Sequence, residues 1–131
     1  MLRIVLASAL LGCAAGRSPA AVVVQRQLEA YNARDVDGFA ATYADDVVVT
    51  RGPDKKLFVE GKQALRAHYG KMFAKCPACR ARVAERKVEA DNVIVDHEII
   101  TGLGPERPDP WDVGWVRYTV DSGLIKNVEL P

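Results

Sequence analysis

Apolar residues in the first part of the chain recur at helical spacing and predict three helices. The helices are expected over residues 19–34, from Asp35 to just before Asp45, and over residues 62–75. In the first, Val24, Leu28 and Tyr31 fall at i, i+4 and i+7, which places them on one face. Asp35 has the chemistry of a helix cap, and Pro77 discourages continuation of the third helix.

The remaining segments are rich in β-branched residues and separated by turn residues, which predicts strands. Strands are expected over residues 47–50, 57–60, 80–89, 93–102, 113–120 and 124–130. Residues 104–110 are rich in glycine and proline and must form a loop. This order contains no parallel βαβ unit, so the fold class is α+β, with three helices on one face of a curved, mainly antiparallel six-stranded sheet. Such a sheet leaves a cone-like hollow in which a small molecule would bind.

Composition indicates one ordinary globular domain rather than a nucleic-acid-binding or membrane-embedded protein. The chain has 131 residues, of which 49% are hydrophobic and 27% charged, with a formal net charge of +1. Nothing in this balance favours nucleic acid as a partner. The two histidines, His68 and His97, fall on different predicted elements without metal-ligand spacing, so neither a metal site nor a cofactor is expected.

The first residues resemble a secretion signal. A single basic residue, Arg3, precedes a run of apolar and small residues over 4–15 that is too short to span a bilayer. Cys13 follows Leu-Leu-Gly, which resembles a bacterial lipobox, although cleavage after Ala20 and a mere apolar extension of the first helix are alternatives. We therefore expect a signal segment over residues 1–18, a domain over 19–131, and export to the periplasm. Any attachment to a membrane would then be through lipid on Cys13.

A predicted hairpin brings together charged residues on one sheet face. With a turn centred on Asp91, Arg86 faces Asp96 and Ala84 faces Glu98, so these charges share a face with apolar neighbours. Arg86 is a candidate ligand anchor, and Asp96 and Glu98 are candidate acid–base groups whose pKa burial would shift. The alternative is a structural ion pair on an open sheet face.

Two cysteines, Cys76 and Cys79, are spaced as in a redox motif. Thioredoxin-like chemistry requires the first cysteine at a helix N-terminus, where the helix dipole stabilises the thiolate. Here the pair follows the end of a predicted helix. A local disulfide or two idle thiols are therefore favoured over a redox centre.

Several segments resemble the NTF2-like (SnoaL-like) superfamily. They are Val23–Arg26, Tyr31–Phe39, Tyr43–Val47, Gly61–Tyr69, Val93–Glu98 and Asp121–Ile125. The resemblance covers nearly all of residues 21–130 and implies the same cone-shaped fold. It does not imply one activity, because this fold hosts isomerases, dehydratases, hydrolases, cyclases and non-enzymatic binders.

The resemblance to ketosteroid isomerases within that superfamily implies specific positions. The isomerase tyrosine, aspartate base and second aspartate correspond here to Gln27, Arg51 and about Trp115. Arginine is not a general base near neutral pH, so steroid isomerisation is not expected. The same positions line the family's cavity, which makes Arg51 and Trp115 candidate ligand-binding residues, with Tyr43 added from the aromatic residues.

Three functions are compatible with these observations. The first is binding of a small, largely apolar molecule in the hollow, with the arginine and carboxylate cluster as its polar anchor. The second is an acid–base enzyme of hydrolase, dehydratase or isomerase type, in which Asp96 or Glu98, held by Arg86, moves a proton. The third is a non-catalytic interaction module that forms a homodimer through the outer sheet face.

Overall fold

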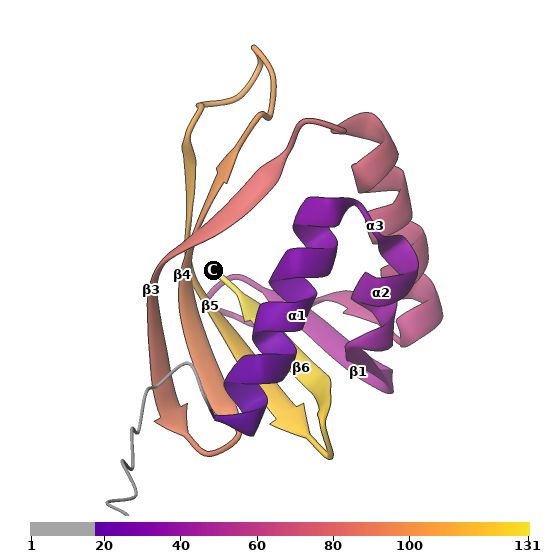
Figure 1. Cartoon of the computed structure of the whole chain (residues 1–131), viewed down its shortest axis with the longest axis vertical. Helices are drawn as coiled ribbons and strands as arrows, with labels where there is room; N and C mark the ends of the chain where they lie inside the picture. Colours follow the sequence, from indigo (N-terminus) through magenta and orange to yellow (C-terminus); the bar gives the residue numbers. More distant parts are fainter. Residues whose placement is uncertain (1–17) are drawn as a thin grey trace, which may run out of the picture.

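The computed structural model describes residues 18–131 and has the predicted α+β architecture (Figure 1). Of the predicted signal segment, residues 1–17, which include Cys13, lie outside the described residues. The elements are α1 (Pro19–Ala33), α2 (Val36–Ala41), β1 (Tyr43–Arg51), β2 (Lys56–Glu60), α3 (Lys62–Lys75), β3 (Arg80–Ala90), β4 (Val93–Thr101), β5 (Trp111–Asp121) and β6 (Leu124–Leu130). Within the described range, no helix is both long and apolar enough to cross a membrane.

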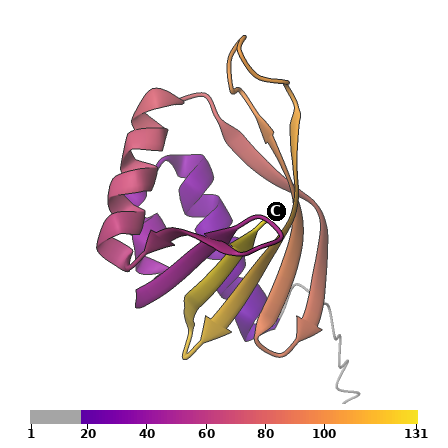
Figure 2. The same cartoon turned by 180° about the vertical axis from the view of Figure 1, so that it is seen from behind.

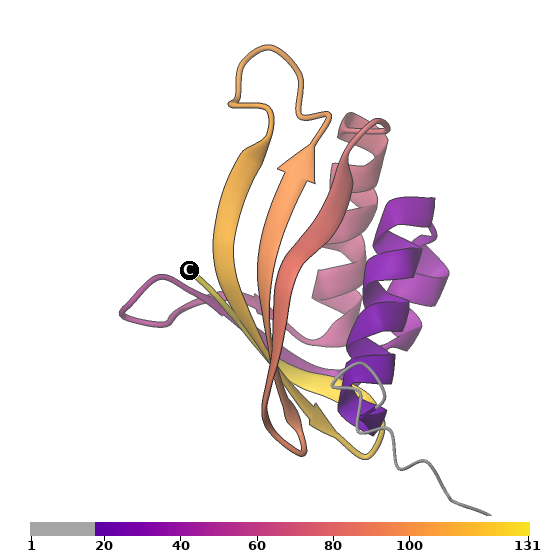
Figure 3. The ribbon, with the colours of Figure 1, turned by 60° about the vertical axis from the view of Figure 1, so that its left-hand side comes forward.

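The six strands form one curved sheet in the order β2-β1-β6-β5-β4-β3. All neighbouring strands are antiparallel except β1 and β6, which run parallel, so the prediction of a mainly antiparallel sheet is confirmed. The three helices lie together on one side of this sheet, as the side view shows (Figure 3). From behind, α3 stands opposite β4 and β5, and the β1–β2 hairpin crosses the view between them (Figure 2). The sheet therefore has a face toward the helices, called here the concave face, and an outer face.

An aromatic cluster joins the helices to the start of β1. The Phe39 ring centre lies 5.0 Å from that of Tyr43, 4.6 Å from that of Tyr69 and 5.7 Å from that of Phe73. Tyr31 meets Phe73 edge to face at 5.4 Å. Such tilted and edge-to-face contacts are the favoured arrangements of aromatic rings, and they bury large apolar areas. This cluster fixes α3 and α2 against α1.

Polar contacts of three residues, Asn32, Arg34 and Asp35, hold the corner between α1 and α2. Asn32 uses its whole amide on Ala81 of β3, donating to its carbonyl at 2.8 Å and accepting from its N–H at 2.7 Å. Arg34 ends α1 in a left-handed conformation and donates to the carbonyls of Cys76, at 2.7 Å, and Cys79. Asp35 caps α2 by accepting from the Gly38 N–H at 2.9 Å. The helical layer is thus pinned to β3 and to the turn that precedes it.

Two local predictions are wrong. Tyr43 was expected on the second helix, but that helix ends at Ala41 and Tyr43 begins β1, where it pairs with Ile125 of β6. Ala84 was expected opposite Glu98, but the register places Val83 there because a bulge in β3 leaves Ala84 unpaired. Such a bulge adds one residue to the strand, so the residues beyond it point to the opposite face from the one that strict alternation predicts. The alternation of apolar and polar residues in the sequence does not reveal the extra residue.

Replacing Asn32 by alanine should destabilise the fold measurably. The change removes two hydrogen bonds and leaves the Ala81 N–H and carbonyl without these partners, at a cost of about 1–3 kcal/mol. The measurement is the free energy of unfolding from urea denaturation. Gln63→Ala, at an exposed position of α3, is the matched amide control and should change stability by less than about 0.5 kcal/mol. Equal stability of the two variants would contradict the assignment of Asn32 as a tie between layers.

Candidate functional site

The Arg86–Asp96 pair lies on the concave face, between β3 and β4, as predicted. The guanidinium approaches the carboxylate with two contacts of 2.7 Å, from Nε to Oδ1 and from Nη2 to Oδ2. A third donor of Arg86, Nη1, binds the amide oxygen of Gln25 on α1 at 3.0 Å. Asp96 is only 1% exposed. A buried carboxylate in such a two-pronged pair is fully occupied by its partner, so its role is structural.

Glu98, two residues further along β4, has a different environment. It is partly exposed, and its Oε1 accepts a hydrogen bond of 2.5 Å from the hydroxyl of Tyr118 on β5. Burial of the carboxyl raises the pKa of Glu98 to about 7; the Asp96 charge raises it further, whereas the Tyr118 hydrogen bond and the Arg86 charge oppose the shift. Burial and the nearby Glu98 charge raise the pKa of Tyr118 well above its usual value, so Tyr118 remains a donor. Glu98 is therefore able to hold or release a proton near neutral pH.

Apolar side chains of partial exposure share the concave face and the elements that frame it. They come from β2, α3, β4, β5 and β6: Phe58, Tyr69, Met72, Ile100, Val113 and Leu130. Directly opposite Glu98 on β5 is Gly114, which has no side chain. Burial raises the pKa of Tyr69 on α3, and the charge of Glu98 raises it further. Glu98 is thus a polar group in a mainly apolar setting that is not completely closed to solvent.

Aromatic and basic residues meet at the edge formed by the β1–β2 hairpin and α3. The Arg51 guanidinium carbon lies 3.9 Å from the ring centre of Phe58. His68 of α3 packs edge to face on the same ring at 4.8 Å. Burial lowers the pKa of His68, and the positive charges of Arg51 and Lys71 lower it further. Arg51, a predicted ligand-binding residue, therefore lies beside Phe58 and His68 at the border of the concave face.

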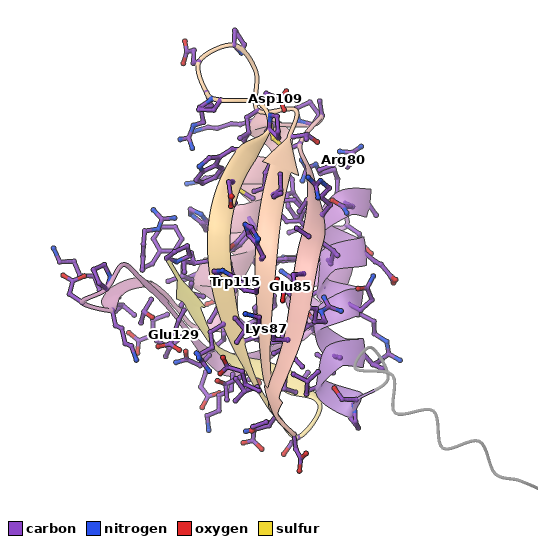
Figure 4. All side chains as sticks on the ribbon, turned by 90° about the vertical axis from the view of Figure 1, so that its left-hand side faces the viewer. Arg80, Glu85, Lys87, Asp109, Trp115 and Glu129 are labelled. Atoms are coloured by element: carbon purple, nitrogen blue, oxygen red, sulfur yellow. A yellow bond between two sulfur atoms is a disulfide. The ribbon has the colours of Figure 1, made fainter. Side chains whose placement is uncertain are left out.

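Trp115 does not line this face, so that prediction is wrong. Its register partner on β4 is His97, whereas the neighbouring pair, Asp96 and Val116, is buried beneath the helices. Trp115 is 38% exposed on the outer face, where the Lys87 ammonium lies 4.1 Å from its ring centre (Figure 4). The resemblance placed this position only to within about one residue, and one residue in a strand is the difference between the two faces.

Two other predicted site residues are committed to the interior. Tyr43 is 2% exposed, packs on Phe39, and its hydroxyl accepts from the Gln27 amide at 3.0 Å. Asp96 is enclosed by Arg86, so it is not an accessible acid or base. The predictions that Tyr43 contacts ligand and that Asp96 moves a proton therefore do not agree with the structure. Glu98 is the carboxylate that remains available.

The Cys76–Cys79 disulfide lies in the turn between α3 and β3, with the two Cα atoms 5.4 Å apart. Arg34 donates to the carbonyls of both cysteines. Gly102, at the end of β4, packs so closely on this turn that an added Cβ would meet the Ala78 carbonyl oxygen at 2.3 Å. The disulfide turn is therefore a structural junction between α1, α3 and β4.

A shallow groove of about 470 Å³ lies apart from this face, along α1 and α2 near the β5–β6 turn. Half of its lining residues are alanine or glycine, and Arg26, Glu29 and Asp35 add charged groups. Asp35 there already caps α2. The groove contains neither Glu98 nor Tyr118, so the concave face is the better candidate for chemistry. In residues 18–131, no group of three or more histidine, cysteine, aspartate or glutamate side chains could hold a metal ion.

Sequence reasoning missed two partners that define the site. Tyr118 was not among the predicted site residues, although Val116 and Tyr118 alternate on the same face of β5 and pair with Asp96 and Ile94. That alternation could have placed Tyr118 near Glu98. Gln25, the third partner of Arg86, had no comparable signal, because the contact joins a helix to a strand 61 residues later.

Glu98→Gln should change the pH dependence of stability. Because the folded state binds this proton more tightly than the unfolded chain, wild-type stability falls as pH rises from about 4.5 to about 7. The full effect is up to about 3 kcal/mol, since one pKa unit corresponds to about 1.4 kcal/mol. Urea denaturation at pH 5 and pH 8 should therefore show wild type losing stability relative to Glu98→Gln. Glu85→Gln, on the outer face, should show the same change in stability between pH 5 and pH 8 as wild type. The same change in Glu98→Gln and Glu85→Gln would contradict the buried environment assigned to Glu98.

Comparison with solved structures places this geometry in a known fold. An uncharacterised cystatin-fold protein from Novosphingobium aromaticivorans superposes with a TM-score of 0.75 at 23% identity, over 88% of this chain and 99% of that chain. RV0760c from Mycobacterium tuberculosis, in complex with estradiol-17beta-hemisuccinate, gives 0.71 at 23% identity, over 87% and 93%. Delta 5-3-ketosteroid isomerase from a Mycobacterium species gives 0.65 at 24% identity, over 87% and 92%. These likenesses establish the NTF2-like, ketosteroid-isomerase-like fold.

The sequence itself gives the family. Among proteins with curated functions, none matches the chain significantly. Residues 24–128, which run from α1 into β6, match the SnoaL-like domain. Since that match covers most of the chain and the fold agrees with it, this protein belongs to the SnoaL-like domain family.

Proposed function

We propose that this protein binds a small, largely apolar molecule on the concave face of its sheet, with Glu98 and Tyr118 as the polar anchor. The observation that carries the proposal is a partly exposed glutamate whose carboxyl group accepts a hydrogen bond from a buried tyrosine, among apolar side chains. Binding sites for small molecules commonly combine an apolar lining with a few polar groups that fix orientation. Glu98 and Tyr118 supply such groups here.

The Tyr118 hydrogen bond determines what Glu98 is able to offer a ligand. Tyr118 donates to Oε1, so Oε2 is free of this contact. Below a pH of about 7 the carboxyl is largely protonated and donates a hydrogen bond to a ligand carbonyl or ether oxygen. Above that pH it accepts from a ligand hydroxyl. A ligand with one carbonyl or hydroxyl group on an apolar skeleton fits this pair.

Relatives of the same fold support this class of ligand. RV0760c was solved with estradiol-17beta-hemisuccinate, a steroid derivative with an apolar ring system and polar ends. At 23% identity, this relative shows that the two proteins share a fold but not that they share a ligand. A steroid is therefore a probe to test and not an assigned ligand. The support for binding by this chain therefore comes from its own Glu98–Tyr118 pair.

An acid–base enzyme is the second candidate, and one observation favours it. A carboxyl group with a pKa of about 7 is suited to take up and release a proton near neutral pH. In that case Glu98 would abstract a proton or activate water, while Tyr118 stabilises its ionised form by donating to it. Steroid isomerisation is not proposed, because the resemblance assigns Gln27, Arg51 and about Trp115 to the isomerase positions.

Ligand binding should depend on Glu98 and not on the outer face. In a thermal-shift screen of steroids, aromatic acids, epoxides and apolar alcohols, at least one compound should raise the melting temperature of wild type. For that compound, Glu98→Gln should weaken the affinity about tenfold, since a hydrogen bond to a charged or ionisable group contributes about 1.5 kcal/mol or more. Titration calorimetry gives the affinities. Trp115→Phe, on the opposite sheet face, is the control and should bind as wild type does.

The outcomes of that experiment separate the candidates. Binding without turnover supports the binder, whereas turnover that Glu98→Gln abolishes supports the enzyme. Binding that Trp115→Phe weakens and Glu98→Gln leaves unchanged would contradict a site on the concave face. If no compound binds, both the binder and the enzyme hypotheses fail. The better hypothesis is then the interaction module, in which two copies associate through the outer face.

Export is a separate part of the proposal, and its support is mainly the sequence of residues 1–18. The start of the fold adds one argument about the cleavage site. Ser18 caps α1 by accepting from the Ala21 N–H at 3.0 Å, and Ala20 is 3% exposed. Cleavage after Ala20 would remove this cap, which is worth about 1 kcal/mol. A cut that leaves Ser18 in place, such as one before Cys13, is compatible with the domain.

Mass spectrometry of the protein purified from its native cells tests export directly. We expect a mature chain that begins at Cys13 and carries lipid on that residue, or a chain shortened elsewhere within the first 17 residues. Treatment with a signal-peptidase II inhibitor should cause the longer precursor to accumulate if Cys13 is lipidated. An intact chain that begins at Met1 would contradict the proposal of export.

A further inference from the structure

Arg51 occupies a position where its charge is free to meet a ligand. It is the last residue of β1, paired with Lys56 of β2 and Leu130 of β6, and its side chain is exposed. The guanidinium carbon lies 3.9 Å from the Phe58 ring centre. Among residues 18–131, no ion pair within 4.0 Å involves Arg51. A guanidinium that stacks on an aromatic ring uses its flat face for that contact. Its N–H groups point outward in the plane of the group and are available to bind a planar anion such as a carboxylate.

The surroundings of Arg51 are positive. The His68 ring packs edge to face on Phe58 at 4.8 Å, and Lys71 follows one turn later on α3. Burial lowers the pKa of His68, and the positive charges of Arg51 and Lys71 lower it further. The hairpin carboxylate of Asp54 and that of Glu129 on β6 are paired with Lys56 and Lys55. The border of the concave face therefore has unpaired positive charge.

Tyr69 connects this border to the interior group. The His68 ring, which packs on Phe58 at 4.8 Å, also meets the Tyr69 ring at 5.2 Å. Phe58, Tyr69 and Met72 provide partly exposed apolar surface on the same side. The concave face thus has a protonatable polar anchor inside and a permanent cation at its border, with apolar surface between them.

We propose that the ligand of this site is an amphipathic carboxylate, whose apolar skeleton lies against Tyr69 and whose anionic end meets Arg51. The proposal rests on the proposed function, because it assumes that a small molecule occupies the concave face. It adds the chemical class of that molecule and names Arg51 as the residue that selects it. The carboxylate is recognised at the border, and the other polar end of the ligand meets Glu98 and Tyr118.

Matched acids and methyl esters test this selection. The probes are estradiol-17beta-hemisuccinate, naphthylacetic acid and dodecanoic acid, each compared with its own methyl ester by titration calorimetry. For at least one pair, wild type should bind the acid about tenfold more tightly than the ester, as expected for a partly exposed charge-assisted hydrogen bond. Arg51→Met keeps aliphatic contact with Phe58 but removes the charge, and it should bring the two affinities to within about twofold.

Two control variants separate local recognition from general attraction. Lys56→Ala removes a positive charge from the position that pairs with Arg51 in the hairpin and should keep most of the preference for the acid. Arg51→Lys keeps the charge without the planar fork and should retain only part of it. A preference that survives Arg51→Met, or equal loss in Lys56→Ala, would overturn the inference.

The failure of this inference is distinguishable from failure of the proposed function. Equal affinity of wild type for acid and ester in every pair overturns the anion selection and leaves small-molecule binding intact. Absence of binding by all six probes overturns the inference as well, and if the wider screen also gives no ligand, the proposed function fails with it.

Discussion

The ion pair between Arg86 and Asp96 determines the character of the concave face. It places a buried carboxylate and a guanidinium in two-pronged contact, with Gln25 occupying a further donor of the arginine. Ionised groups are tolerated inside a protein when they are paired and hydrogen-bonded in this way. Because the arginine is committed to Asp96, Glu98 receives only a small part of its charge. The same pair therefore holds β3 to β4, and the negative charge of an ionised Glu98 is only weakly balanced by Arg86.

The two faces of the sheet separate structural from candidate functional chemistry. On the outer face, Lys87, His97 and Trp115 interact with one another and with solvent. On the concave face, Arg86 pairs with Asp96 and Gln25, and Glu98 accepts a hydrogen bond from Tyr118. The junction of Asn32 and Arg34 with β3 and the disulfide turn keeps the helical layer at a fixed place over that face. On a stable frame of this kind, one fold accommodates different activities.

The sequence was sufficient for the fold and for the pairing of Arg86 with Asp96. Periodicity and turn residues predicted three helices and six strands, and the hairpin turn at Asp91 placed Arg86 opposite Asp96. The prediction that failed for Trp115 depended on a position uncertain by one residue, and adjacent strand residues point to opposite faces. The role of Asp96 failed for another reason, because alternation reports which face a residue occupies and not whether a partner encloses it.

The difference in role between Asp96 and Glu98 is visible only in the three-dimensional structure. Both residues follow the same pattern on β4, yet one is enclosed by an arginine and the other meets a tyrosine hydroxyl. Only the contacts with β3, β5 and α1 distinguish them. Membership of the SnoaL-like family does not supply this distinction either, since the family shares a fold across several chemistries.

The central claim is that Glu98 carries a proton near neutral pH within an apolar setting. Its most direct test is carbon-13 NMR of the glutamate side-chain carboxyl groups, with the Glu98 signal assigned by comparison with Glu98→Gln. We expect this carboxyl to titrate with a pKa of about 7. A Glu98 pKa near 4.5 would show that the carboxyl is solvated like any surface glutamate, and the proposed anchor would not exist.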